Sequence, residues 1–377
     1  MLAGYLLALF RGMIALLTLP ALENTPPELP SWPKLSLVVA ACNEESTIEE
    51  ALKSLLTVDY PDLELIVVND RSADKTGEII DRVAKEKPEI RVVHIQELPD
   101  GWLGKLNALE QGTRISSGKY VIYTDADVHY TRDVLRRAVA LCEKENLGHL
   151  ALLPKIYGQT VGLMASLPLF FLGYVNALDL PSLGKPGSKA FAGAGAFNMV
   201  RREEYEKTEG FSWLKMEIGD DVGLGMMMVQ QAGVKSRLAT AIHSLEVQWY
   251  RNVPELVRGL EKNSFSCMAR FEIKRAVGAS LIFLGTLTAL IGTFFFPFLW
   301  TRIAGGIVLA ALLLMAGVAF RKVDSPIWST LLSPLTFPLF SWILMRSTWK
   351  TLRSGGITWR GTFYPMDQLK EGQRVKI

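Results

Sequence analysis

The chain has 377 residues and a net charge of only +3, so no broad basic surface suited to nucleic acid is expected. Its hydrophobic fraction of 49% and its mean hydropathy of +0.20 are high for a wholly soluble protein, and the excess lies near the two ends. Cys42, Cys142 and Cys267 are odd in number and far apart, so they indicate neither a disulfide framework nor a zinc pattern and fit a reducing cytoplasm.

The first apolar segment spans residues 1–22 and has Arg11 in its middle. Glu23 and a proline-rich stretch (25–33) follow it, and neither offers a small-residue cleavage site. We therefore predict an uncleaved N-terminal membrane anchor over residues 1–22, tilted or lying in the membrane interface. A cleaved signal peptide is the alternative.

Short apolar runs then alternate with stretches of helical spacing. The runs predict strands at residues 35–41, 63–69, 90–95 and 119–125, and the spacing predicts helices at 44–56, 74–87 and 104–116. Strands this apolar are covered on both faces, which indicates an α/β domain with a Rossmann-like, mostly parallel sheet. Such sheets bind ligands at the carboxyl ends of their strands.

Carboxylates follow two of these predicted strands. Asp70 comes at the end of the second strand, and Asp125 and Asp127 come at the end of the fourth. Acids in these positions converge on one crevice, and an Asp-x-Asp pair suits Mg²⁺ or Mn²⁺ bridging to a diphosphate. Ordinary capping of turns and helices is the alternative, with even odds for Asp74, whereas we favour the functional interpretation for Asp125 and Asp127.

A long uncharged run at residues 161–178 contains Pro168. A membrane crossing here would separate Asp127 from Asp221 and is untenable if the two share one site. An interfacial helix that seats the domain on the bilayer and guides a lipid acceptor is preferred. A buried helix of the core is nearly as well supported.

The C-terminal region contains three apolar stretches, residues 276–300, 303–320 and 326–345. The first two are uncharged and form a predicted helical hairpin, whereas Pro334 and Pro338 interrupt the third, which is a kinked span or a re-entrant or interfacial segment. Basic residues flank the hairpin and continue in the tail 346–377, so the positive-inside rule places the α/β domain (35–270) and the tail in the cytoplasm. We therefore expect a multi-pass protein of the cytoplasmic membrane. With the tail inside, residues 326–345 should not cross fully.

The ordered segments VVAACNEE, VVNDRSAD, GWLGKLNALEQG, YTDAD, GAGAFNMVRREEY and GDDVGLGMMM, within residues 35–255, resemble a large family of inverting glycosyltransferases. That family has the GT-A fold and includes cellulose and hyaluronan synthases and dolichyl-phosphate sugar synthases. The membrane hairpin and the tail sequence GGITWRGTFY are most similar to bacterial members associated with hopanoid, carotenoid or ceramide-type lipids.

The resemblance implies roles on the donor side. Asp70 matches the acid that binds the base, and Lys105 lies near the donor, where a cation also contacts the diphosphate. Asp125 and Asp127 match the family's Asp-x-Asp pair, with Asp127 as the direct metal ligand. The loop after the first strand lies along the nucleotide through Ala41, Asn43 and Glu45.

It also implies roles on the acceptor side. Gly193 and Gly195 match a small-residue loop that lines the acceptor. Asp220 and Asp221 match a Glu-Asp pair whose second acid is the catalytic base, with Asp220 in place of Glu; capping of a helix N-terminus is the alternative for either acid.

The family's Gln-x-x-Arg-Trp segment corresponds to a stretch that begins with Gln248 and Trp249. Arg251 is retained and is expected to touch the diphosphate, but Asn252 replaces the final Trp, which normally stacks on the acceptor sugar. Extension of a polymer is therefore disfavoured. His243, just upstream, matches a histidine that is a third metal ligand in some GT-A enzymes, although a lone His is more often structural.

Together these features predict metal-dependent, inverting transfer of a sugar, from a nucleotide-sugar such as a UDP-sugar to a hydroxyl of a lipid acceptor at the bilayer. A processive polysaccharide synthase is the first rival. A nucleotidyltransferase would carry a Gly-rich basic phosphate loop after the first strand, which VVAACNEES lacks. A non-enzymatic membrane protein would need neither Asp127 nor Asp221.

Overall fold

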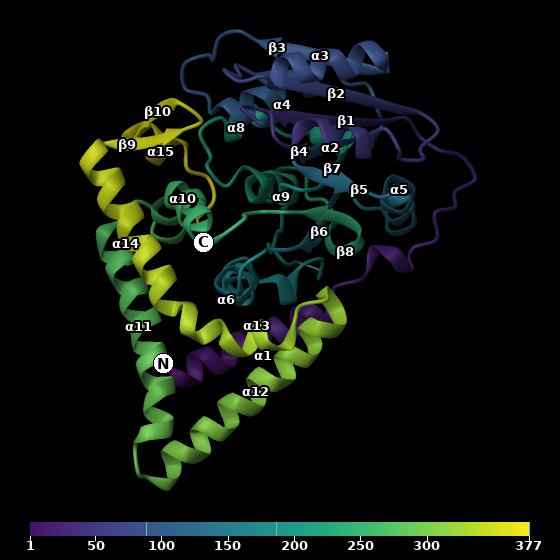
Figure 1. Cartoon of the computed structure of the whole chain (residues 1–377). Coiled ribbons are helices and arrows are strands. Elements are labelled where there is room, and N and C mark those ends of the chain that lie inside the picture. The colour runs from purple at the N-terminus through teal and green to yellow at the C-terminus, as the bar shows by residue number, and fades with distance from the viewer. Residues whose placement is uncertain (88, 186, 377) are drawn as a thin grey trace.

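An eight-stranded sheet stands above a set of long apolar helices in the computed structural model, which describes residues 1–87, 89–185 and 187–376 (Figure 1). The sheet has the strand order β3-β2-β1-β4-β7-β6-β8-β5. Its strands are β1 Leu35–Ala41, β2 Leu63–Asp70, β3 Ile90–Ile95, β4 Tyr120–Asp125, β5 Val128–Tyr130, β6 His149–Ile156, β7 Asn198–Arg201 and β8 Ser236–Val247.

The first four strands are parallel to one another, and β6 and β8 form a second parallel pair. Strand β7 joins the two groups by antiparallel pairing with β4 and β6, and β5 runs antiparallel to β8. The predicted mostly parallel sheet is therefore confirmed, and the four strands expected from the sequence are β1 to β4.

Helices cover both faces of the sheet because its strands are apolar on both sides. In β1, Leu37 and Val39 pack into one core with α2 and α3, whereas Val38 packs into the other with α4. This arrangement explains why the strand sequences show no polar alternation. The helices of this part are α2 Ile48–Leu55, α3 Thr76–Glu86, α4 Gly104–Ile115, α5 Val134–Glu145, α6 Val161–Ala177, α7 Arg202–Tyr205, α8 Phe211–Leu214, α9 Asp220–Gln231 and α10 Val253–Asn263.

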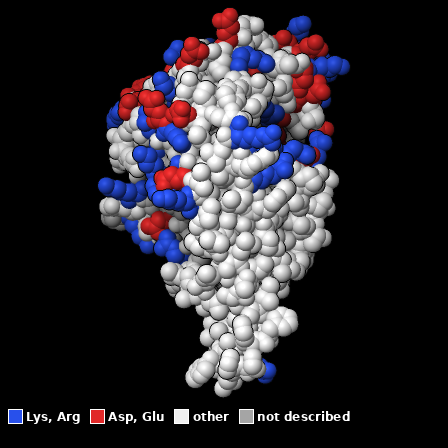
Figure 2. Space-filling model, turned by 90° about the vertical axis from the view of Figure 1, so that its left-hand side faces the viewer, with Lys and Arg blue, Asp and Glu red and all other residues white. Residues whose placement is uncertain are grey.

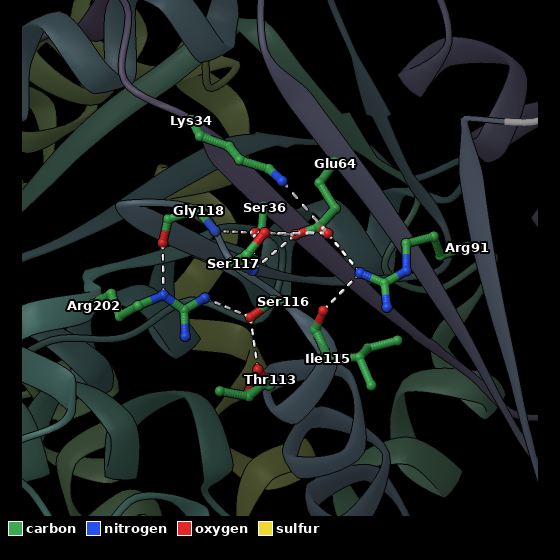
Figure 3. A network of polar contacts seen from close by, with 10 residues as sticks. All are labelled: Lys34, Ser36, Glu64, Arg91, Thr113, Ile115, Ser116, Ser117, Gly118 and Arg202. Atoms are coloured by element: carbon green, nitrogen blue, oxygen red, sulfur yellow. Dashed lines mark hydrogen bonds and ion pairs between the residues drawn. The ribbon is translucent and has the colours of Figure 1, made fainter.

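A polar network fastens the amino ends of the central strands (Figure 3). Glu64, near the start of β2, accepts hydrogen bonds from Ser36 Oγ (2.7 Å), the N–H of Ser117 (2.9 Å) and Arg91 (2.6 Å). Burial opposes ionisation of Glu64, but these donors hold its pKa below the ordinary value. Every partner in this network belongs to the protein, so the network is explained as a structural one. The carboxyl ends of the strands are therefore the place to look for a ligand site.

Three helices after the sheet domain are long and apolar enough to cross a membrane: α11 Ile273–Phe295, α12 Leu299–Val323, and a segment Ile327–Ser354. The last consists of α13 Ile327–Leu332, a 3₁₀ turn and α14 Phe337–Ser354. Helices α11 and α12 descend to a common turn, and the lower part of the face in Figure 2 is uncharged apart from one basic group at its tip.

Helices α1 (Leu2–Thr18) and α6 lie between the sheet and these apolar helices (Figure 1). Arg11 of α1 pairs with Asp179 (2.5 Å) and donates to Asn176 (3.0 Å) at the end of α6. Both α1 and α6 are shorter than the three candidate spans.

The segment expected as a basic tail is largely folded. Helix α14 continues past residue 345 to Ser354, and β9 Gly356–Trp359 pairs with β10 Thr362–Pro365 in a hairpin. Helix α15 (Met366–Gly372) follows and buries Leu369 against the sheet domain. The tail therefore returns to the same part of the molecule as the strand ends.

Candidate active site

Lys105 joins carboxylates from two distant segments at the carboxyl edge of the sheet. Its Nζ lies 2.7 Å from Asp125 Oδ1, at the end of β4, and 2.8 Å from Asp220 Oδ2, at the start of α9. The three side chains come from α4, β4 and α9, so the sheet order and two helix starts bring them together. Asp221 follows Asp220 directly, and both acids line one pocket with Lys105 and Gly195.

The start of α4 packs tightly against the end of β2. A Cβ on Gly104 would lie 2.2 Å from Asp70 Oδ2, so only glycine lets the helix begin here. Asp70 is 4% exposed and pairs with its neighbour Arg71 at 2.8 Å. The predicted base-binding acid therefore lies beside the helix start that carries Lys105.

The predicted acceptor-side glycines form a bridge between the two acidic segments. The carbonyl of Gly195 accepts from the N–H of Asp125 (3.0 Å), and its own N–H donates to Asp221 Oδ2 (3.1 Å). A Cβ on Gly193 would lie 1.9 Å from the backbone oxygen of Asp221. Close backbone approach at both glycines fixes Asp221 relative to the end of β4.

A buried polar chain supports Asp221 from the sheet. Asn198 Nδ2 donates to the backbone oxygen of Asp221 (2.9 Å), and its Oδ1 lies 2.7 Å from Nε2 of the fully buried His149. Because that oxygen accepts, His149 Nε2 donates and Nδ1 accepts from the Ser236 hydroxyl at 2.7 Å. Burial lowers the pKa of His149 to about 4, so the ring is neutral at physiological pH.

The acids of the site differ in protonation. Desolvation and the charges of Asp125 and Glu44 raise the pKa of Asp127 to about 7, and desolvation with Asp220 raises the pKa of Asp221 to about 6. Burial also opposes ionisation of Asp125, but Lys105 holds its pKa below the ordinary value. Lys105 therefore keeps Asp125 ionised, while Asp127 and Asp221 titrate near neutral pH.

The loop after β1 is fastened to the loop after β2 by two residues predicted to lie along the donor. Asn43 adopts a left-handed φ of 55°, and its Oδ1 accepts from the N–H of Ala73 (2.8 Å). Glu45 Oε2 accepts from the N–H of Lys75 (3.1 Å). Ala41, at the end of β1, is buried. The side chains of Asn43 and Glu45 thus hold the two loops together by accepting hydrogen bonds from the backbone of the loop after β2.

Asp125 and Asp127 provide hard oxygen donors that suit a divalent cation. Burial first, and then the charges of Asp125 and Glu44, raise the pKa of Asp127; a divalent cation would offset both effects, so these two residues fit the ion. Within residues 1–87, 89–185 and 187–376, no group of three or more metal-ligating side chains is found. His243 is exposed, and its N–H donates to Glu23 Oε1 (3.0 Å).

The segment after β8 lies between the site and α6. The ring of Trp249 is 4.7 Å from that of Phe170 in α6, and Gln248 is half-buried. Arg251 is exposed, and its N–H donates to Glu255 Oε2 (2.9 Å). Trp249 therefore connects this segment to the layer nearest the apolar helices, whereas none of the contacts found in the described residues joins the side chain of Arg251 to the carboxylates.

Several residues near the site were not anticipated. Glu217 is 1% exposed and accepts from the N–H groups of Gly219 (2.9 Å), Arg374 (2.6 Å) and Val375 (2.8 Å). Arg360, between β9 and β10, donates to the carbonyl of Asn43 (3.3 Å) and pairs with Glu44. No spacing in the sequence signals the contacts with Arg374, Val375 and Asn43, because those partners lie more than a hundred positions away.

Comparison with known proteins agrees with this geometry. Residues 36–207 match the family Glycosyl transferase family 2. Beta-monoglucosyldiacylglycerol synthase of Nostoc sp. is 30% identical over 201 residues, which are 52% of this chain and 41% of that protein. Poly-beta-1,6-N-acetyl-D-glucosamine synthase of Staphylococcus epidermidis is 37% identical over 93 residues, which are 25% of this chain and 21% of that protein. The chain thus matches less than half the length of these curated relatives.

A solved structure extends the likeness to the fold. The mannosyltransferase PcManGT from Pyrobaculum calidifontis, in complex with GDP-Man and Mn²⁺, aligns with 94% of this chain and 99% of its own, at 18% identity and a TM-score of 0.52. At that identity the likeness concerns the fold alone. Residues 36–207 therefore match the model of Glycosyl transferase family 2, and the chain shares its fold with that mannosyltransferase.

Proposed function

We propose that this protein transfers a sugar from a nucleotide-sugar donor to a hydroxyl group of a membrane lipid, with inversion at the anomeric carbon. The observation that carries the proposal is the Lys105 bridge, which joins Asp125 at the strand end to Asp220 beside Asp221. Lys105 lines one pocket with the acceptor-side acids Asp220 and Asp221, and its pairing with Asp125 connects that pocket to the donor side. The family 2 domain and a relative named as a monoglucosyldiacylglycerol synthase support transfer to a lipid.

Asp221 is the proposed base. With a pKa near 6 it is ionised at neutral pH, yet basic enough to accept a proton from the acceptor hydroxyl as that oxygen attacks. The N–H of Gly195 orients its carboxylate, and Asn198 holds its backbone. Mg²⁺ or Mn²⁺ held by Asp127 and Asp125 would neutralise charge on the nucleoside diphosphate.

On the donor side, Asp70 is proposed to bind the base, with the loop of Ala41, Asn43 and Glu45 along the nucleotide. Lys105 is already held by two carboxylates and presents its charge to the same pocket. Gln248 and Trp249 are proposed to face the acceptor. We assign no metal-binding role to the exposed His243.

A lipid acceptor is supported by the link between α6 and the acceptor-side loop. Tyr174 of α6 donates its hydroxyl to the carbonyl of Gly193 (2.7 Å) and accepts from the N–H of the same residue (3.1 Å). Helix α6 also packs against α1 and α13 beside the apolar region. A lipid that enters along this layer would bring its headgroup to Asp221.

The contacts of the tail favour two complete membrane crossings. Thr362 Oγ1 accepts from Arg71 (3.3 Å), and Tyr364 Oη accepts from the N–H of Gly104 (3.2 Å), so the tail and the sheet domain lie on one side. The number of crossings between them must then be even. We propose that α11 and α12 cross and that the segment 327–354 does not cross fully. Basic residues at both ends of the hairpin favour the cytoplasmic side.

The function is tested with purified full-length chain, a panel of UDP- and GDP-sugars, Mg²⁺ or Mn²⁺, and membrane lipids as acceptors. We expect one donor to give a metal-dependent glycolipid. Asp221→Asn should lower kcat by roughly 10²–10⁴-fold while donor binding is kept, and Asp127→Ala should lose the response to metal. Asp62→Asn removes an exposed carboxylate as a control and should act like the wild type. Wild-type activity in Asp221→Asn, or no turnover of any donor, would refute the proposal.

A further inference from the structure

A second lysine lies beside the candidate active site without a carboxylate partner. Lys262, in the last turn of α10, has its Nζ 3.6 Å from the centre of the Trp359 ring. None of the ion pairs among the described residues includes Lys262, whereas its neighbour Glu261 pairs with both Arg346 and Lys350. A half-buried cation held only by an aromatic ring is free to bind an anion.

The pocket that Lys262 lines adjoins the Lys105 bridge. Leu103 and Ile218 line it together with Lys262 and Trp359. Leu103 precedes Lys105 by two positions and Ile218 precedes Asp220 by two positions, and the charges of Lys105 and Asp220 both act on Lys262. Tyr364 is a further wall, and its hydroxyl accepts the N–H of Gly104 at the start of α4.

The electrostatic surroundings agree with a site for a multiply charged anion. Burial and the neighbouring charge of Lys105 lower the pKa of Lys262 to about 8; Asp220 and Asp125 oppose this shift, and Arg360 adds to it. Three cations from α4, α10 and the β9–β10 hairpin therefore repel one another at one place. A bound dianion or trianion would relieve that repulsion, whereas a neutral ligand would not.

We propose that Lys262 binds the diphosphate of the nucleotide-sugar donor, with Trp359 holding the lysine in position. The proposal rests on the function proposed above and adds a donor-binding residue to it. Lys105 is engaged directly by two carboxylates, whereas none of the ion pairs among the described residues includes Lys262, so its ammonium group remains available to the donor. The folded tail is then part of the donor site, since Trp359 belongs to β9.

The test measures the dissociation constants of UDP, GDP, CDP, dTDP and ADP for the full-length chain in detergent with Mn²⁺, by calorimetry. Lys262→Met keeps an apolar side chain on Trp359 but removes the charge, and it should weaken the preferred diphosphate about ten- to a hundredfold. Lys262→Arg should restore most of the affinity. Arg258→Met removes a positive charge from the exposed face of the same helix and should have no effect.

Three results would overturn the inference. These are wild-type affinity in Lys262→Met, an equal loss in Arg258→Met, and a loss in Lys262→Met that is accompanied by a fall in melting temperature and not repaired by Lys262→Arg. If the wild type itself binds none of the five diphosphates, the proposed function fails as well. Binding that survives Lys262→Met overturns the role of Lys262 alone.

Discussion

Replacing Glu217 by Ala should loosen the loop that carries Asp221. Its carboxylate accepts three backbone N–H groups at 2.6 to 2.9 Å, from Gly219 and from Arg374 and Val375 in the tail. A hydrogen bond to a charged group contributes about 1.5–3 kcal/mol, and the three are not additive, so the loss should be roughly 3–5 kcal/mol. The buried N–H of Val375 and the partly buried N–H groups of Gly219 and Arg374 would be left without this acceptor.

The assay combines melting temperature in detergent with transfer kinetics. We expect Glu217→Ala to lower the melting temperature by roughly 5–10 °C. It should also lower kcat by about a hundredfold, because a small displacement of the Asp221 carboxylate takes it out of position for the acceptor hydroxyl. Glu371→Ala, which removes an exposed carboxylate of α15, is the matched control. Truncation after residue 372 removes two of the donors and should not add to Glu217→Ala. Additive effects, or an unchanged Glu217→Ala, would refute the contact between loop and tail.

Two further outcomes are expected. Because the pKa of Asp221 is raised to about 6, kcat/KM should fall about tenfold per unit as pH decreases below 6, where the base is protonated; a rate that is flat down to pH 4.5 would exclude Asp221 as the base. Gly193→Ala would place a Cβ 1.9 Å from the backbone oxygen of Asp221, and it should lower the free energy of unfolding by about 1–3 kcal/mol and abolish most activity. Gly173→Ala is the control, because a Cβ there meets nothing within 4 Å. It should leave the melting temperature and the transfer rate unchanged.

The parallel half of the sheet could be predicted from the sequence because its strands are apolar runs of six to eight residues. Strands β5 and β7 have three and four residues, too few for any periodicity to distinguish them from loops. The antiparallel insertion of β7 between β4 and β6 depends on tertiary pairing, which no local pattern encodes. The apolar helices were evident from length and lack of charge.

The candidate site was predictable only where residues end strands or begin helices. The strand-end rule led to Asp70 and Asp125, and the structure brings Asp125 to Lys105 and Asp220. Lys262 and Glu217 lie in segments whose charged residues resemble an ordinary solvated surface. Their environments are created by the tail, through Trp359 and Val375, and a fold of the tail onto the sheet domain is not visible in its basic composition.

The contact between Glu217 and the tail also constrains how the protein is made. Arg374 lies 157 positions after Glu217, and all three apolar helices are synthesised in between. These helices are therefore synthesised before the loop with Asp221 can receive its last two N–H donors. A nascent chain carries an unfinished Asp221 loop until Arg374 and Val375 have left the ribosome, so this loop is among the last parts of the fold to be completed.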